Sequence, residues 1–185
     1  MNLKDYSFTK EWTLFLDRDG VISDRLPDDY VRRWEDFRFL DGVPEALAML
    51  NPVFGRIIVV SNQQGVGKGL MSQQNLEEID RFMKKYIEEH YGRIDASFYC
   101  THLASENHPD RKPGTGMALK AKEKYPEIDF SKSVMIGDSP SDIEFGQRLG
   151  MVTVFIGKTE HETITVDYIF NSLLEFAKSL NDNQN

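Results

Sequence analysis

The sequence predicts an α/β fold in which helices cover both faces of a parallel β-sheet. Short stretches rich in β-branched and aromatic residues alternate with longer stretches in which apolar residues recur every three or four positions. This alternation of strand and helix is typical of a sheet whose strands all run in one direction. The 185 residues, 40% of them hydrophobic, suffice for one compact domain. We therefore expect a single domain over residues 1–180, followed by a disordered tail over residues 181–185.

Five strands are expected along the chain, and all of them are short and apolar. The second contains an unbroken run of Ile and Val after its first residue, which is typical of a strand that is buried on both faces. In chain order, the expected strands are Thr13–Leu16, Arg56–Val60, Ser97–Cys100, Ser133–Ile136 and Val152–Phe155.

Five helices are expected between and after these strands. The longest begins at Ser72, which is a suitable N-cap, and carries an apolar stripe from Leu76 to Ile87 at helical spacing. Packing against the core is the simplest explanation of that stripe. In chain order, the expected helices are Val43–Leu50, Ser72–Tyr91, Gly116–Tyr125, Pro140–Leu149 and Ile169–Leu180.

The composition argues against several classes of partner. A net charge of -8 repels nucleic acid and anionic lipid over most of the surface, so neither is expected as a partner. The apolar runs are far shorter than the roughly 20 residues of a membrane helix. Cys100 is the single cysteine, which excludes an internal disulfide and fits a reducing compartment, so we expect a cytoplasmic protein. A small anionic substrate is still compatible with this charge, and the oligomeric state is left open.

Polar motifs follow four of the expected strands. In parallel sheets, ligands bind beyond the carboxyl ends of the strands. The first strand is followed by Asp17–Gly20, the second by Ser61–Gly65 and the fourth by Gly137–Asp142, while Arg111–Pro113 lies beyond the third. No one of these motifs is specific alone, because short acidic or glycine-containing turns are common. Their order and their common placement at strand ends carry the functional hypothesis.

This set of motifs resembles that of the haloacid dehalogenase-like (HAD-like) phosphatases, and the similarity covers roughly residues 12–157. Within that superfamily, Phe15–Ile22 (Phe-Leu-Asp-Arg-Asp-Gly-Val-Ile) and Ser61–Gln63 are similar to a narrower group. That group contains the D-glycero-D-manno-heptose 1,7-bisphosphate phosphatases and the phosphatase domain of histidinol-phosphate phosphatases. The resemblance implies a Rossmann-like three-layer sandwich with a central parallel sheet and little or no cap domain.

The resemblance further implies that a small phosphorylated metabolite is hydrolysed in two steps. Asp17 would be the nucleophile, because a carboxylate can attack phosphorus and form an aspartyl-phosphate. Asp19 faces the same side of an extended segment and would be general acid for the leaving alkoxide, then general base for water. Lys112 would stabilise the negative charge of the transition state.

Mg²⁺ is the expected cofactor, because both the nucleophile and the phosphate are anionic. The carboxylates of Asp17 and Asp138 and the backbone carbonyl of Asp19 would hold it in an oxygen shell. Asp142 lies one helical turn after Asp138 and would orient Lys112 or a metal-bound water without binding the metal itself. The expected contacts to phosphate or substrate are the Ser61 hydroxyl, the backbone N–H groups of Arg18 and Asn62, and the side chains of Asn62 and Arg111.

Typical members of the narrower group also carry a zinc loop, with the pattern Cys-x-His, a spacer, and Cys-x-Cys before Arg-Lys-Pro. Here Cys100 and His102 match the first pair, but His108 and Asp110 stand where the two later cysteines are expected. All four residue types can bind zinc. The loss of two thiolates nevertheless removes the softest ligands, so the sequence favours a loop without zinc while still permitting the metal.

Three other interpretations stay open at this stage. Histidinol phosphate is the main rival substrate. A phosphoacceptor signalling domain would share the Asp, the Ser/Thr, the Lys and Mg²⁺, but its acceptor follows a later strand and lacks an acid two residues on. A catalytically inactive binding protein is less favoured, because all motif residues are present. The aromatic residues of Asp24–Phe39 are expected to cover the open site, where Arg32 or Arg33 is an option for contacting a distal phosphate.

Overall fold

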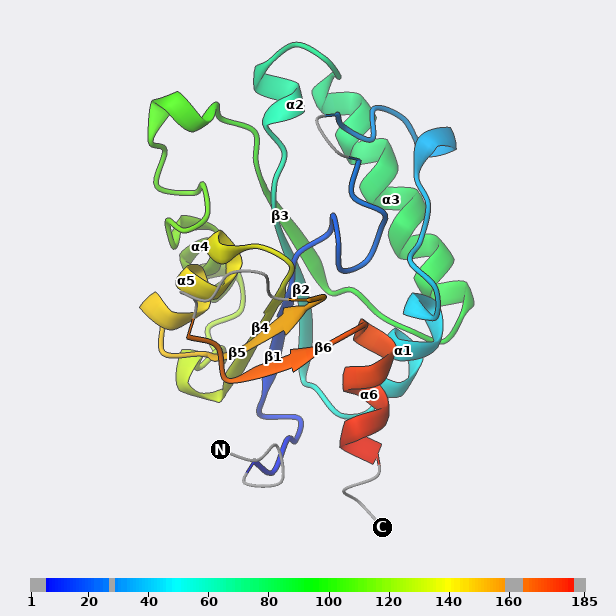
Figure 1. The fold of residues 1–185 in the computed structure, drawn as a ribbon, viewed down its shortest axis with the longest axis vertical. Helices are drawn as coiled ribbons and strands as arrows, with labels where there is room; N and C mark the ends of the chain where they lie inside the picture. Colours follow the sequence, from blue (N-terminus) through cyan, green and yellow to red (C-terminus); the bar gives the residue numbers. More distant parts are fainter. Residues whose placement is uncertain (1–5, 27–28, 159–164, 182–185) are drawn as a thin grey trace.

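A computed structural model describes residues 6–26, 29–158 and 165–181 and shows a six-stranded sheet in the order β3-β2-β1-β4-β5-β6. Every neighbouring pair of strands is parallel. Figure 1 shows the sheet at the centre of the molecule. The strands are β1 (Thr13–Leu16), β2 (Arg56–Asn62), β3 (Ala96–Cys100), β4 (Ser133–Gly137), β5 (Val152–Ile156) and β6 (Tyr168–Phe170).

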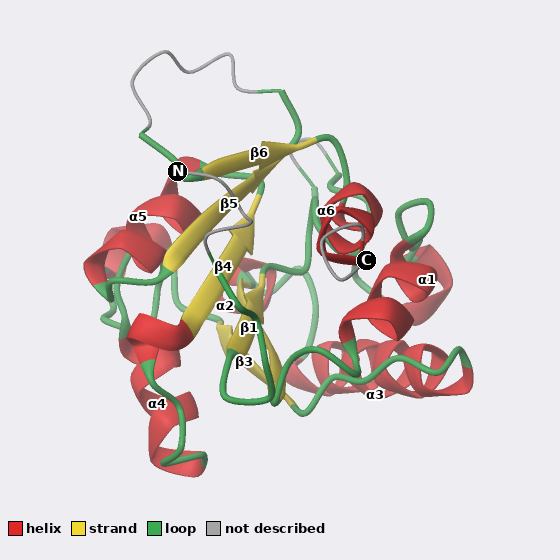
Figure 2. Cartoon of the chain, turned by 90° about the horizontal axis from the view of Figure 1, so that it is seen from below, coloured by secondary structure: helices red, strands yellow, loops and turns green. Residues whose placement is uncertain are grey.

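Helices cover both faces of the sheet, so the fold has three layers. Figure 2 shows α1, α3 and α6 on one face and α4 and α5 on the other. This confirms the predicted Rossmann-like α/β class, and the described residues between β1 and α1 form only a 3₁₀ turn, η2 (Trp34–Asp36), which leaves little or no cap. The helices are α1 (Val43–Leu50), α2 (Gln64–Gly67), α3 (Gln73–Glu89), α4 (Gly116–Lys124), α5 (Pro140–Arg148) and α6 (Leu173–Asn181), with further 3₁₀ turns η3 (Ala104–Glu106) and η4 (Phe130–Lys132).

The central strands β1, β2, β4 and β5 are buried on both faces, and alternate side chains enter two separate cores. Leu14 and Leu16 of β1 pack into the core beneath α1, α3 and α6, whereas Phe15 packs into the core beneath α4 and α5. All three side chains are fully buried. This division follows from the two-residue repeat of a strand, and it explains why the strands read as continuous apolar runs.

Helix α3 begins as predicted, with Ser72 as its N-cap. The Ser72 hydroxyl accepts a hydrogen bond from the Asn75 N–H at 3.0 Å, and the Asn75 side chain accepts one from the Ser72 N–H at 3.1 Å. This reciprocal pair satisfies donors that the first helical turn leaves unpaired. Leu76 and Ile87, at the two ends of the predicted stripe, are buried in the core, which confirms the packing interpretation.

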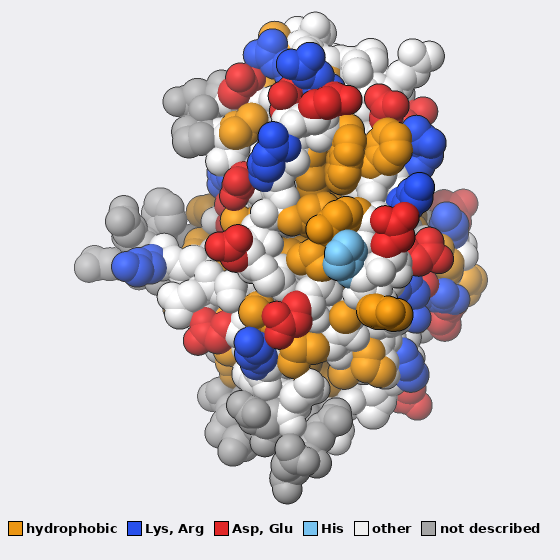
Figure 3. Space-filling view, turned by 90° about the vertical axis from the view of Figure 1, so that its right-hand side faces the viewer, with side chains coloured by type: hydrophobic (Ala, Val, Ile, Leu, Met, Phe, Trp, Pro, Cys, Tyr) orange, Lys and Arg blue, Asp and Glu red, His pale blue; other side chains and the backbone are white. Residues whose placement is uncertain are grey.

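Of the aromatic residues after β1 that were predicted to cover the site, Tyr30 lines the cavity, but Trp34 and Phe39 pack elsewhere. Trp34 packs against Phe82 of α3 with ring centroids 5.5 Å apart, and Phe39 stacks on Tyr86 at 4.7 Å. They therefore cover the side of α3, on a face where Figure 3 shows a band of hydrophobic side chains. Burial against an amphipathic helix gives these rings more apolar contact than an open polar pocket would.

The predicted helix over Ile169–Leu180 is wrong at its beginning. Tyr168–Phe170 forms the edge strand β6, and α6 begins only at Leu173. A three-residue strand is too short to show an alternating pattern, and Ile169 is half exposed. Residues 64–67 likewise form the short helix α2, which the sequence analysis did not predict. Of the predicted tail, Asn181 is the last residue of α6, and the rest lies outside the described residues.

The strand order explains where a site forms. The chain runs from β1 outward to β2 and β3 and then returns to the other side of β1 to form β4, so the direction of winding changes between β1 and β4. Leu16 pairs with Ile136, and the Asp17 N–H donates to the Ile136 carbonyl at 2.9 Å. Open α/β sheets bind ligands at such a switch point. Among the described residues, no helix combines the length and apolar character that crossing a membrane requires.

Candidate active site

A cavity of about 440 Å³ opens at the carboxyl ends of β1, β2 and β4. It collects residues that lie far apart in the sequence, from Asp17 to Ser141. Arg18 and Asp142 lie fully buried behind its wall. The structure thus brings together all the residues predicted for phosphatase chemistry, while their individual roles stay predictions. The predicted residues that line the cavity are Asp17, Asp19, Ser61, Asn62, Arg111, Lys112 and Asp138.

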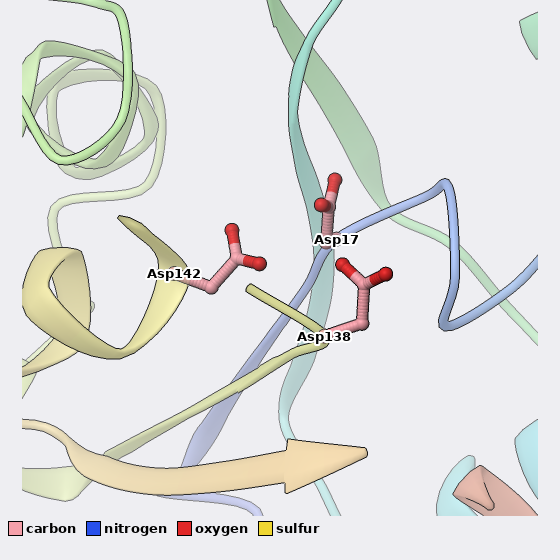
Figure 4. A group of neighbouring side chains, drawn as sticks. All are labelled: Asp17, Asp138 and Asp142. Atoms are coloured by element: carbon pink, nitrogen blue, oxygen red, sulfur yellow. The ribbon is translucent and has the colours of Figure 1, made fainter. Parts of the chain in front are cut away.

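Three carboxylates converge at the floor of this pocket. One oxygen each from Asp17, Asp138 and Asp142 lies within 4.8 Å of the other two, and Figure 4 shows the side chains pointing toward a common space. They come from the end of β1, the end of β4 and the first turn of α5. In residues 6–26, 29–158 and 165–181, this is the one such group of three or more His, Cys, Asp or Glu side chains. Hard oxygen donors of this kind suit Mg²⁺.

Glycine is required where the chain passes these carboxylates. Gly20 has φ of +88°, and a Cβ there would lie 2.0 Å from the Asp138 Oδ2 atom. At Gly137, an added Cβ would lie 2.1 Å from the Cβ of Asp142. Only a residue without a side chain allows the two loops to approach so closely. The glycines beside the motifs therefore serve to bring the acidic residues together.

Lys112 is the buried cation of the cluster. Its Nζ atom lies 3.0 Å from Asp17 Oδ1 and 2.6 Å from Asp142 Oδ1, and it donates to the Val60 carbonyl at 2.8 Å. Burial by itself lowers the pKa of Lys112, but attraction to Asp142 and Asp17 outweighs it and raises the pKa above its ordinary value. The ammonium group therefore stays charged between the two carboxylates.

Asn62 and Asp142 hold Lys112 in place. The Asn62 side chain donates to the Lys112 carbonyl at 3.1 Å and accepts from the Lys112 N–H at 3.0 Å. Asp142 Oδ2 accepts from the Ser139 N–H at 3.0 Å and from the Ser139 hydroxyl at 2.6 Å, which leaves Oδ1 to face Lys112. Asp142 thus occupies the position expected of a residue that orients Lys112. Asn62 touches the Lys112 backbone, a contact that the sequence did not reveal.

Two carboxyls of the cluster, those of Asp17 and Asp138, have raised pKa values. Burial raises the pKa of Asp17 to about 7; Lys112 opposes this shift, and repulsion from Asp142 and Asp19 adds to it. Burial and repulsion from Asp142 also raise the pKa of Asp138, against the effect of Arg25. A divalent cation bound between these carboxylates would favour their charged forms, because its charge offsets both the cost of burying them and their mutual repulsion.

Asp19 is surrounded differently. The Arg18 Nε atom lies 2.9 Å from Asp19 Oδ1, and Gln63 Nε2 donates to Asp19 Oδ2 at 2.6 Å. Burial acts to raise the pKa of Asp19, but attraction to Arg18 and these hydrogen bonds outweigh it, so the pKa is lowered. The backbone N–H of Arg18, predicted to bind phosphate, donates to Asp17 Oδ1 at 2.7 Å. The Arg18 side chain and Gln63 received no role from the sequence, since nothing in the pattern shows that they face Asp19.

Arg25 is a pocket residue that sequence reasoning missed. Its Nη1 atom lies 3.0 Å from Asp138 Oδ2. Arg32 and Arg33, considered for a distal phosphate, pair instead with Asp29 and Asp36 on the surface and do not line the cavity. The sequence could not choose among these arginines, because the direction of each side chain depends on how the segment after β1 folds back.

Among the described residues, the four side chains considered for zinc do not form a convergent group of donors. The His102 and His108 rings stack with centroids 3.7 Å apart. His102 Nδ1 is 2.6 Å from Glu106 Oε2, and Asp110 pairs with Lys120. Burial raises the pKa of the Cys100 thiol, which disfavours the thiolate that binds metal. The donors are therefore paired with neighbours and do not converge on a common point.

Comparisons with known proteins agree with this geometry. A protein-family model described as HAD-hydrolase-like matches residues 110–176. The chain is 37% identical over 172 residues to a D-glycero-alpha-D-manno-heptose-1,7-bisphosphate 7-phosphatase of Mycobacterium bovis, covering 90% of each protein. It is 33% identical over 159 residues to a D-glycero-D-manno-heptose-1,7-bisphosphate 7-phosphatase of Chlorobaculum tepidum, covering 80% of this chain and 79% of that protein.

A solved structure has a similar fold. The D,D-heptose 1,7-bisphosphate phosphatase of B. bronchiseptica, complexed with magnesium and phosphate, superimposes with a TM-score of 0.84 at 23% identity, covering 92% of this chain and 98% of that one. At this identity the likeness concerns the fold alone, and the sequence relatives above carry the assignment. The chain belongs to the HAD-like superfamily of phosphatases, in the family that includes these heptose bisphosphate phosphatases.

Proposed function

We propose that this protein is a Mg²⁺-dependent phosphatase that removes the 7-phosphate of D-glycero-D-manno-heptose 1,7-bisphosphate. The observation that carries the proposal is the convergence of Asp17, Asp138 and Lys112 on one pocket at the switch point of the sheet. Two relatives that are 37% and 33% identical to this chain over most of its length are named for that activity. Asp17 directly follows the first strand, β1, and a second acid, Asp19, lies two residues later. A signalling receiver domain has its acceptor after a later strand and lacks that second acid, so it is disfavoured.

The reaction uses two displacements at phosphorus. In the first, an Asp17 oxygen forms a bond to phosphorus while the bond to the sugar oxygen breaks. Asp19, which must carry a proton at this stage although its surroundings lower its pKa, gives that proton to the sugar oxygen. In the second, a water oxygen bonds to phosphorus and loses a proton to Asp19, while the bond to Asp17 breaks and releases phosphate. Lys112, 3.0 Å from Asp17 Oδ1, stabilises negative charge in both steps.

The acidic cluster fits the cofactor. The carboxylates of Asp17 and Asp138 and the backbone carbonyl of Asp19 would hold Mg²⁺, with Asp142 already engaged by Lys112 and Ser139. When bound, the ion supplies positive charge that offsets the repulsion between a carboxylate nucleophile and a phosphate. Ser61 lines the pocket beside Asp17, and its hydroxyl would contact phosphoryl oxygens.

The pocket suits a substrate with two anionic groups. Besides Lys112, the cations Arg25, Lys68 and Arg111 line the same cavity. Lys68 Nζ donates to the Tyr30 hydroxyl at 3.1 Å, and Arg25 pairs with Asp138 while its side chain is largely exposed. A ligand phosphate would compete with these partners for the two cations. A bisphosphate would place its reacting phosphate at Asp17 and its second phosphate among these side chains, where Arg111 offers a planar fork of donors.

Phosphate release from a panel of phosphoesters tests the proposal. The panel contains both anomers of the heptose bisphosphate, histidinol phosphate and p-nitrophenyl phosphate, each with and without Mg²⁺. We expect the highest kcat/KM for a heptose bisphosphate and no turnover after chelation. A clear preference for histidinol phosphate would replace the proposed substrate. An aspartyl-phosphate that persists for hours without turnover would instead favour a signalling function.

A further inference from the structure

Two fully buried side chains, Arg18 and Gln63, surround the Asp19 carboxylate from behind the pocket wall. Asp19 Oδ1 accepts from Arg18 Nε at 2.9 Å and from the Ser23 hydroxyl at 3.2 Å. Asp19 Oδ2 accepts from Arg18 Nη2 at 3.1 Å and from Gln63 Nε2 at 2.6 Å. A carboxylate has about four lone-pair directions. Each of them has a donor here, so the side chain is held in one orientation.

Arg18 and Gln63 also hold each other. Arg18 Nη2 donates to Gln63 Oε1 at 2.9 Å, and the Gln63 backbone N–H donates to the Cys100 carbonyl at 2.7 Å, which fixes the residue at the end of β2. The remaining Arg18 nitrogen, Nη1, is buried without a hydrogen-bond partner among the described residues. Burying a guanidinium group with an unpaired nitrogen is unfavourable. Stability alone therefore does not explain an arginine at this position.

Gln63 connects Asp19 to the phosphate side of the pocket. Its Nε2 atom lies 2.6 Å from Asp19 Oδ2 and also donates to the Ser61 hydroxyl oxygen at 3.1 Å. One amide thus touches both the acid/base carboxylate and the hydroxyl that faces the reacting phosphate. When Asp19 exchanges a proton with the leaving group or with water, one of its four donors must yield. Gln63 is able to yield because Ser61 gives it a second acceptor.

We propose that Arg18 and Gln63 are positioning residues that aim the Asp19 carboxylate at the leaving-group oxygen, with Gln63 as the donor that gives way during proton transfer. This inference rests on the proposed phosphatase function and adds two residues to it. Arg18 keeps the carboxylate at the wall through a two-point contact. Gln63 sets the direction of Oδ2, the oxygen that then transfers the proton.

Comparing substrates with two different leaving groups separates misorientation of Asp19 from loss of folding. A sugar alkoxide needs a proton as it departs, whereas p-nitrophenolate departs readily without one. Since kcat/KM reports the first phosphoryl transfer, a disoriented Asp19 lowers kcat/KM for the heptose bisphosphate far more than for p-nitrophenyl phosphate. Both substrates are measured on the same preparation, so a smaller folded fraction lowers both values equally.

The variants are Gln63→Met, which removes the amide, and Gln63→Glu, which places an acceptor beside Asp19 and competes for Arg18. We expect kcat/KM for the heptose bisphosphate to fall about 10-fold in Gln63→Met and about 100-fold in Gln63→Glu, because a misdirected acid loses part of the roughly 10²- to 10⁴-fold that general acid catalysis supplies. For p-nitrophenyl phosphate it should change by less than about 3-fold. Gln73→Met, at an exposed amide that bonds only Glu77 at 3.0 Å, is the matched control and should change neither.

Equal losses on both substrates, or no loss on either, would overturn the inference. Failure of the proposed function gives a different result, because wild-type protein would then release no phosphate from any member of the panel. If the wild type prefers another alkyl phosphate, that compound replaces the heptose bisphosphate in the test. Its change in kcat/KM is then compared with the change for p-nitrophenyl phosphate in the same way.

Discussion

Two regions of this molecule contain residues able to bind metal, and they differ in what surrounds them. Asp17, Asp138 and Asp142 come from separate strand ends, and their oxygens converge within 4.8 Å. Cys100, His102, His108 and Asp110 lie within 11 residues of one another in the sequence, yet each pairs with a neighbour or stays buried as a thiol. Closeness in the sequence thus did not predict which metal-binding side chains converge. The parallel sheet instead brings residues that are distant in the sequence to one edge.

The difference has a physical cause. Neighbouring residues hold each member of the acidic cluster in position. Ser139 hydrogen-bonds Asp142, the ammonium group of Lys112 pairs with Asp17, and Gly20 lets the chain pass close to Asp138. In the loop, Glu106 and Lys120 satisfy the polar groups without a metal. A convergent set of carboxylates favours the binding of a cation. A loop whose polar groups are already paired does not need a cation to satisfy them.

The largest expected effect in this comparison is that of Asp17→Asn. An amide cannot form the aspartyl-phosphate, so phosphate release should fall by at least about 10³-fold while the fold is retained. Asp36→Asn, at an exposed carboxylate paired with Arg33, is the control. Phosphate release from p-nitrophenyl phosphate and circular dichroism measure the two properties. Near-normal turnover of Asp17→Asn would exclude Asp17 as the nucleophile.

The next largest effect is expected from the two lysines that mark the two regions. Lys112→Met removes the buried charge between Asp17 and Asp142, and kcat should fall about 10²-fold. Lys120→Met removes the partner of Asp110 in the loop, and kcat should stay within about twofold. Steady-state kinetics of both variants, each checked by thermal melting, decide the point. Equal effects of the two substitutions would mean that the regions do not differ in function.

A moderate effect is expected from pH on Mg²⁺ affinity. The pKa of Asp17 is raised to about 7 and that of Asp138 is also raised, so below pH 7 the ion must displace a proton. The apparent affinity should therefore rise with pH, by up to about tenfold per unit for each displaced proton, and level off above pH 7. Calorimetric titration of Mg²⁺ between pH 5 and 8 measures it. A flat profile would contradict these raised pKa values.

The smallest effect is expected in the loop. The double substitution His102→Ala and His108→Ala should leave kcat/KM within about twofold, because both rings are outside the cavity and partly exposed. Mass-spectrometric metal analysis of protein purified without added metal should find far less than one zinc per chain. Stoichiometric zinc would show that the loop is a metal site after all.

Much of the site could be predicted because its chemistry lies in short motifs at strand ends. The motifs around Asp17, Ser61, Lys112 and Asp138 were each recognisable from residue type and position, and all four now line one cavity or its wall. Arg25 could not be chosen over Arg32, because the segment 24–39 contains four arginines that look alike and shows no periodicity. β6 was missed for a related reason: three residues do not show a period.

The sequence by itself determined the class of fold and the residue types for the chemistry, because apolar periodicity and motif order depend only on the order of the residues in the chain. The tertiary structure alone decided which side chains share a contact. It placed Gln63 between Asp19 and Ser61, aimed Arg25 at Asp138, and stacked His102 on His108. Such contacts depend on rotamers and on loops that meet only after the sheet has formed, and no local pattern encodes them.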